Sequence, residues 1–71
     1  MTVKQLLTVL ECDSITICYA GFGQRIYKGT VIDLIKNPKC SYVLNYFVTL
    51  VIPHDNHIYI EVHENKNFLE D

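Results

Sequence analysis

Residues 42–52 read Tyr-Val-Leu-Asn-Tyr-Phe-Val-Thr-Leu-Val-Ile, and the wider segment 40–54 carries no formal charge at pH 7. β-Branched and aromatic residues dominate this run, so it predicts one long β-strand. Because side chains alternate between the two faces of a strand, both faces here are largely apolar and both need to be covered. A chain of 71 residues has little material for this, so we expect self-association or a protein partner. The expected self-association residues are Tyr42, Leu44, Tyr46, Phe47 and Val48.

Length and composition restrict the class of protein. The chain is long enough for one domain, which we expect over residues 1–63, followed by a polar tail over residues 64–71. The sequence has no run of about 18 apolar residues and no signal-peptide pattern, so we expect a cytoplasmic protein without a membrane span. Three cysteines without C-x-x-C spacing favour reduced thiols, and a Cys12–Cys40 disulfide is the alternative.

The net charge of −2 is unevenly distributed along the chain. Residues 25–39 hold four basic residues and one acidic residue, whereas residues 55–71 hold five acidic residues and one basic residue. A nucleic-acid-binding protein usually presents a strongly basic face, so this pattern makes nucleic acid an unlikely partner. The basic middle and the acidic end are suited to pair head to tail between two copies of the chain.

Capping and alternation patterns predict the elements. Thr2 and Gln5 form a capping box before an apolar helical stripe over residues 3–11. Residues 14–28 alternate around a Gly-rich turn and predict a hairpin, and Thr30 begins a second helix that ends at Pro38. Residues 53–56 have turn chemistry and residues 57–62 alternate as a last strand.

The predicted order is α-β-β-α-β-β. It indicates a small α+β domain with an antiparallel four-stranded sheet and two short helices. An offset of 28 residues aligns Thr2-Val3 with Thr30-Val31 and Cys12 with Cys40, so the order is also compatible with an internal duplication.

The sequence gives only weak indications of a metal site or a catalytic site. His54, Asp55 and His57 share one turn, but their spacing matches no zinc signature, so we expect solvated histidines and no metal or other cofactor. A Cys18–His63 nucleophile pair lacks an orienting third group and oxyanion donors. We therefore expect no catalytic residues and a protein that is not an enzyme.

Tyrosine gives a better indication of function. Five tyrosines occur in the chain and tryptophan is absent. Tyrosine and arginine are favoured at protein interfaces, and simple alternation would place Arg25 and Tyr27 on one face of the first hairpin. The alternative is that these side chains belong to an ordinary solvated sheet. The expected binding residues are Phe22, Arg25, Tyr27, Lys28 and Tyr59.

The first half of the chain resembles short uncharacterised proteins from phages and mobile elements of Firmicutes. The likeness rests on residues 2–7 (Thr-Val-Lys-Gln-Leu-Leu), on Ile17 and Tyr19 in an Ile-x-Tyr strand, and on residues 26–34 (Ile-Tyr-Lys-Gly-Thr-Val-Ile-Asp-Leu). Such a resemblance implies a phage or mobile-element context, in which small acidic proteins often bind host proteins, including defence nucleases. It transfers no functional residues, and the neutral segment 42–52 departs from it.

The sequence thus predicts a small, non-enzymatic protein-binding module that forms a homodimer. In its narrowest form the prediction is a phage-type inhibitor of a host or defence protein. One alternative is an oligomeric protein that sequesters a small ligand or nucleotide, with Arg25, Lys28 and tyrosines around an anion. Another alternative is an accessory structural subunit of a larger assembly.

Overall fold

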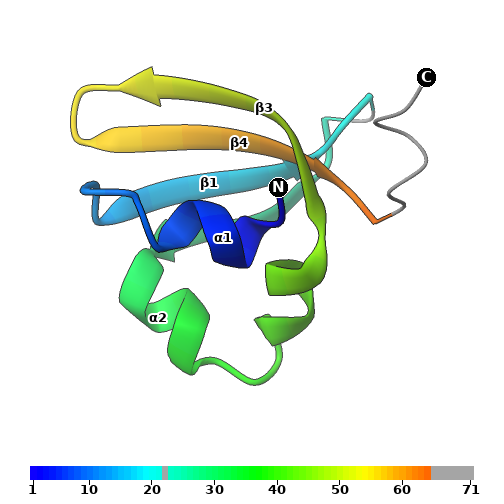
Figure 1. Cartoon of the computed structure of the whole chain (residues 1–71), viewed down its shortest axis with the longest axis horizontal. Coiled ribbons are helices and arrows are strands. Elements are labelled where there is room, and N and C mark those ends of the chain that lie inside the picture. The colour runs from blue at the N-terminus through cyan, green and yellow to red at the C-terminus, as the bar shows by residue number, and fades with distance from the viewer. Residues whose placement is uncertain (22, 65–71) are drawn as a thin grey trace.

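The computed structural model describes residues 1–21 and 23–64, and its elements follow the predicted order with one addition (Figure 1). The chain forms a small α+β domain with a four-stranded sheet and two short α-helices, and the addition is a 3-10 helix before the third strand. Of the predicted tail, only Glu64 lies within the described residues. The elements are α1 (Val3–Leu7), β1 (Ser14–Tyr19), β2 (Arg25–Thr30), α2 (Val31–Lys36), η1 (Ser41–Asn45), β3 (Phe47–His54) and β4 (His57–His63).

The sheet is mixed, so the prediction of a wholly antiparallel sheet was wrong. Its strand order is β2-β1-β4-β3, with antiparallel hairpins at both sides and a parallel pair, β1 and β4, in the centre. The cause is the path of the chain after β2. Helices α2 and η1 carry it across one face of the sheet to the far edge (Figure 1), so the second hairpin enters there and β4 returns beside β1 in the same direction.

The predicted helix caps are confirmed. The Gln5 backbone N–H donates to Thr2 Oγ1 at 3.3 Å, and the Thr2 N–H donates to Gln5 Oε1 at 2.9 Å. Thr30 Oγ1 accepts from the Asp33 N–H at 3.1 Å and caps α2 through this bond. Helix α1 ends earlier than predicted, at Leu7, because the next turn tightens and the Thr8 hydroxyl donates to the Gln5 carbonyl at 2.7 Å.

The long strand predicted over residues 42–52 is wrong in its first part. Residues Ser41–Asn45 form η1, and the strand itself runs from Phe47 to His54. The turn after Pro38 continues into this helix, since the Ser41 hydroxyl donates to the Pro38 carbonyl at 3.1 Å. Helical geometry turns Val43 into the core, where it is fully buried, so tertiary packing overrides the β-propensity of the segment.

The core lies between the central strands and the helices. Ile15 and Ile17 of β1 and Ile60 and Val62 of β4 are all fully buried on the face that α1, α2 and η1 cover. Leu34 of α2 completes this layer from the helical side. The opposite face of the sheet has no helix over it in the described part of the chain (Figure 1), so we call it the open face. An internal duplication stays a prediction. The two halves differ in one element, because η1 has no counterpart between α1 and β1.

Candidate functional site

Side chains on the open face change in character from one edge of the sheet to the other. Residues that stand opposite one another on paired strands share a face, so the register defines rows across the sheet. In each row the β2 residue is charged or polar, the central residues are polar apart from the buried Cys18, and two of the three β3 residues are apolar. The rows are Thr30–Ser14–His57–His54, Lys28–Thr16–Tyr59–Ile52 and Arg25–Cys18–Glu61–Leu50.

His57 is held in the middle of the open face. Ser14 Oγ lies 2.7 Å from its Nδ1, and Thr16 Oγ1 lies 2.7 Å from its Nε2. Both ring nitrogens therefore already have hydrogen-bond partners within the chain. Among the described residues, no group of three or more His, Cys, Asp or Glu side chains is arranged to hold a metal ion. The turn predicted over residues 53–56 is shorter in the structure: His54 is the last residue of β3, and both His54 and Asp55 are exposed.

Tyr59 is also engaged within the chain. Its hydroxyl donates to Glu61 Oε2 at 3.0 Å. A hydrogen bond with the Cys18 thiol, followed by the bond with Glu61, raises the pKa of Tyr59 to about 12. Cys18 itself is buried on this face, and all three cysteines are free. The polar centre of the open face is thus satisfied internally, which is the arrangement of a structural polar layer.

Three of the five predicted self-association residues lie elsewhere than expected. Tyr42 and Leu44 belong to η1, and Tyr46 precedes the strand. The Tyr46 and Tyr19 hydroxyls lie 3.4 Å apart, and the Tyr42 ring meets the Tyr46 ring edge-on at 5.6 Å between centroids. The bond with Tyr19, and next the burial of the phenol, raises the pKa of Tyr46 to about 12. Leu44 packs against the core, while Phe47 and Val48 do begin β3.

The predicted binding residues of the first hairpin do not share one face. The strand register shifts between Ile17 and Cys18, so Arg25 stands opposite Cys18 on the open face and Tyr27 opposite Ile17 on the helical face. Tyr27 donates its hydroxyl to the Thr30 carbonyl at 2.7 Å, and burial first, then the nearby Asp33 carboxylate, raises its pKa. Lys28 and Tyr59 share one row of the open face. Phe22 lies outside the described residues.

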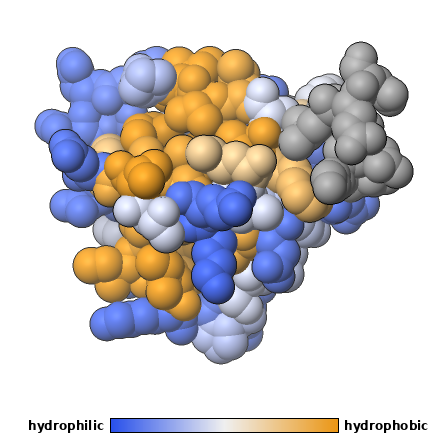
Figure 2. Space-filling model, viewed as in Figure 1, coloured by the Kyte–Doolittle hydropathy of each residue, from blue (hydrophilic) through white to orange (hydrophobic). Residues whose placement is uncertain are grey.

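The outer edge of β3 is the most distinctive surface. We use this term for the side of residues 49–54 that faces away from β4. Leu50, Val51 and Ile52 are consecutive residues of this segment, with 42%, 38% and 39% of their surface exposed. Figure 2 shows apolar atoms gathered over this part of the sheet. No charged side chain occurs from Phe47 to His54 when histidine is neutral.

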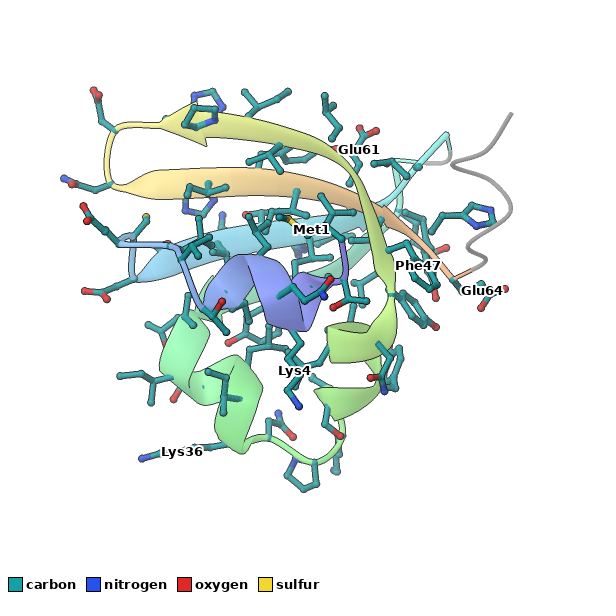
Figure 3. The ribbon with its side chains drawn as sticks, in the orientation of Figure 1. Met1, Lys4, Lys36, Phe47, Glu61 and Glu64 are labelled. Carbon is teal, nitrogen blue, oxygen red and sulfur yellow. The ribbon has the colours of Figure 1, made fainter. Side chains whose placement is uncertain are left out.

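The N-terminal segment covers the neighbouring part of the same edge. The Val48 N–H donates to the Met1 carbonyl at 2.8 Å, the Val3 N–H donates to the Tyr46 carbonyl at 2.9 Å, and Thr2 bridges Phe47. Figure 3 shows Met1 beside the curved first part of β3, with Phe47 next to it. The backbone of β3 is therefore paired on both sides at its start and on one side along the outer edge.

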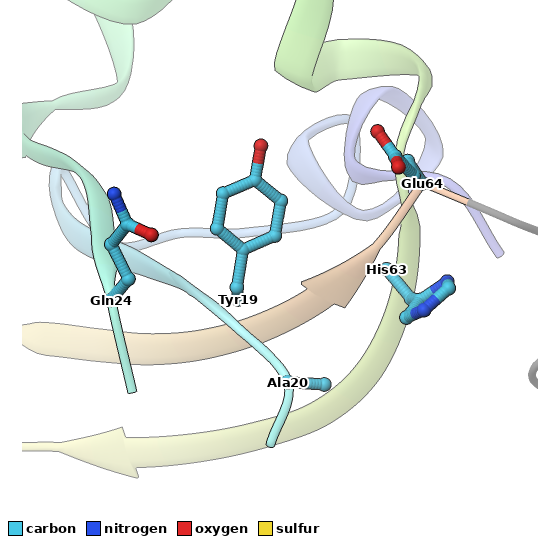
Figure 4. Close-up of a pocket in the computed structure, with 5 residues that line it drawn as sticks. All are labelled: Tyr19, Ala20, Gln24, His63 and Glu64. Carbon is cyan, nitrogen blue, oxygen red and sulfur yellow. The ribbon is translucent and has the colours of Figure 1, made fainter. Parts of the chain in front are cut away.

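Two of the surface hollows are lined by groups that form no catalytic arrangement. One of about 280 Å³ at the end of the sheet is lined by Tyr19, Ala20, Gln24, His63 and Glu64 (Figure 4). Figure 4 shows these side chains spread around the hollow without convergence on one point. Another, of about 260 Å³ and almost wholly apolar, lies between the helices and η1 and includes Leu7, Ile35 and Leu44. Within residues 1–21 and 23–64, neither hollow combines a nucleophile with a base and an oxyanion donor.

Comparisons with known proteins provide no family. No protein-family model matches the sequence, and neither the curated proteins nor the solved structures contain a match to it. None of the helices in the described part of the chain has the length and apolar character that crossing a membrane requires.

The exposed apolar residues of β3 lie later in the chain than most of the residues that the sequence predicted to self-associate. The exposed residues at the outer edge are Leu50, Val51 and Ile52, whereas the prediction emphasised Tyr42, Leu44 and Tyr46. The missing signal was Pro53. Proline has no N–H and is confined to strand edges, so its position next to Ile52 marks the second half of the strand as the open edge.

Proposed function

We propose that the chain is a non-enzymatic protein-binding module that binds its partner through the outer edge of β3. One observation supports this most strongly: three consecutive apolar side chains, Leu50, Val51 and Ile52, are exposed on a neutral edge strand. An exposed edge offers unpaired backbone groups to an added strand, and flanking apolar side chains supply contact area.

The proposal of a non-enzyme is supported by the state of the polar groups. His57 is bonded at both ring nitrogens, and Tyr59 is bonded to Glu61. A catalytic acid or base needs a free position toward its substrate. That the partner is a host or defence protein stays a prediction from the sequence.

The alternative of ligand sequestration has less support. It requires Arg25 and Lys28 at a seam between copies, but both stand on β2, at the opposite edge of the sheet from the apolar strand. A thermal-shift screen against nucleotides tests this alternative, because a sequestering protein is stabilised strongly by its ligand. The accessory-subunit alternative uses the same outer edge and differs only in the size of the partner.

Site-specific photocrosslinking tests the proposal. A photoreactive phenylalanine analogue at Ile52 should crosslink to a protein, either a second copy or another chain, in concentrated protein or in lysate. The matched control is Ile32 of α2, which is 60% exposed and belongs to the helical side. Crosslinking at position 52 that disappears in a Leu50→Lys background supports the proposal. Equal labelling at both positions, or none at position 52, contradicts it.

A further inference from the structure

The hairpin register determines which backbone groups of β3 point outward. The two-residue turn Asp55–Asn56, with Asn56 at φ 55°, makes His54 and His57 the closing pair. Antiparallel pairs alternate between bonded and non-bonded, so Ile52 bonds toward β4 while Val51 and Pro53 direct their backbone groups to the outer edge. Pro53 fits this assignment because it has no N–H to donate toward β4.

Val51 is therefore the residue that offers both an outward N–H and an outward C=O in the middle of the open segment. A residue on a two-fold axis faces its own copy. The Val51 N–H of one chain then meets the Val51 C=O of the second copy, and the reverse bond forms at the same time. In this register the backbone donors and acceptors of the outer edge pair with those of an identical edge.

The neighbouring side chains agree with the same register. Leu50 stands opposite Ile52 of the second copy on the open face, twice in the dimer, and both residues are about two-fifths exposed in the single chain. No like charges meet, because the strand has no charged residue between Phe47 and His54. In this register the hairpin tip with Asp55 approaches the Thr2–Phe47 bridge of the other chain.

The N-terminal segment limits the pairing in one direction along β3. Its bonds to Tyr46 and Val48 occupy the edge before residue 49, so a second copy cannot slide in that direction. About five residues remain for pairing, which is a usual strand length. An interface of this size is at the small end for specific association, so we expect a dissociation constant of about 1–100 µM.

We infer that the partner at the outer edge of β3 is a second copy of this chain, joined by two-fold antiparallel pairing of β3 centred on Val51 into one eight-stranded sheet. This inference rests on the proposed function, since it names the occupant of the same edge.

Opposite charges at position 51 test the inference. Val51→Lys and Val51→Glu each place two like charges face to face at the two-fold axis, so each variant should be monomeric by light scattering at concentrations where the parent chain is dimeric. An equimolar mixture of the two should restore the dimer, since Lys then faces Glu. Circular dichroism of each variant verifies that it is folded, and Lys28→Glu on β2 is the control that leaves the dimer intact.

The outcomes separate the dimer from the proposed function. Loss of the dimer in each variant and its recovery on mixing support the inference. A parent chain that stays monomeric up to about 1 mM, charge variants that dimerise like the parent, or folded variants that do not recover on mixing overturn it. In any of those cases, photocrosslinking from position 52 to a different protein would still support the proposed protein-binding function. If no such crosslink forms, both the dimer and the proposed function are contradicted.

Discussion

The two edge strands of the sheet, β2 and β3, differ in how they meet solvent. β2 presents Arg25 and Lys28 and leads directly into α2. β3 has no charged side chain, and Leu50, Val51 and Ile52 are exposed in succession. Both strands pair with a central strand on one side, and the N-terminal segment bonds to the other side of β3 only at its start.

This difference shows which edge is protected against pairing. Charged residues, lysine in particular, make a strand edge unfavourable for addition of another strand. β2 has this protection, whereas the protection on β3 consists of Pro53 and the N-terminal segment at its start. The open segment between these two features is where association should be sensitive to substitution.

The largest effect is expected from a charge at the outer edge. Leu50→Lys removes an apolar contact that occurs twice in a two-fold dimer and adds two charges near the seam. We expect at least a tenfold weaker association, which corresponds to about 1.4 kcal/mol, in sedimentation or light scattering across a concentration series. Ile32→Lys, at a more exposed site on α2, is the matched control and should leave association unchanged. Equal weakening by both variants would show that association does not depend specifically on the outer edge.

A backbone N–H donor at position 53, which proline lacks, should strengthen association. Pro53→Val gives the outer edge an N–H that it now lacks and places a β-branched residue, which favours strands, at this position. Two added hydrogen bonds in a dimer, each of about 0.5–1.5 kcal/mol, predict association that is tighter by about tenfold. The measurement is the same concentration series. If Pro53→Val leaves the association constant unchanged, the backbone at residue 53 does not face the partner.

Local rules predicted the parts of the fold that depend on neighbouring residues. The Thr2–Gln5 and Thr30–Asp33 caps were predicted from their spacing and are present as hydrogen bonds. The two hairpins also follow from alternation and turn chemistry, with Gly21 and Gly23 at positive φ in the first turn. These features depend on contacts within a few residues, which a sequence pattern records directly.

Long-range packing determined what the sequence did not predict. Residues 42–46 have strong β-propensity, yet they form η1 and its end because Val43 is buried beneath the sheet. The parallel pairing of β1 with β4 depends on the crossover of α2 and η1, which no alternation pattern specifies. As a result, Tyr42, Leu44 and Tyr46, which were expected on a long strand, lie outside β3.

A smaller effect is expected at Gly29 of the protected edge. A Cβ at this position would lie 2.8 Å from the Tyr27 hydroxyl oxygen, which donates to the Thr30 carbonyl. Gly29→Ala should therefore displace the phenol and lower the free energy of unfolding by about 1 kcal/mol in urea denaturation. The cost should be smaller in a Tyr27→Phe background, where that oxygen is absent. Equal costs in both backgrounds would mean that the ring does not restrict residue 29.

The smallest effect concerns Tyr59, which stands opposite Ile52 in the row that leads to β3. Its pKa of about 12 exceeds the ordinary value of 10, chiefly through the Cys18 hydrogen bond. Because the folded pKa is the higher one, the contribution of Tyr59 to stability is complete below about pH 10 and is lost as the pH rises through 12. NMR of ¹³C-labelled tyrosine, assigned with Tyr59→Phe, should show Tyr59 ionising at lower pH in Cys18→Ala but not in Cys40→Ala. If Cys18→Ala leaves that titration unchanged, the thiol does not bond the phenol, and the polar layer beside β3 depends on Glu61 alone.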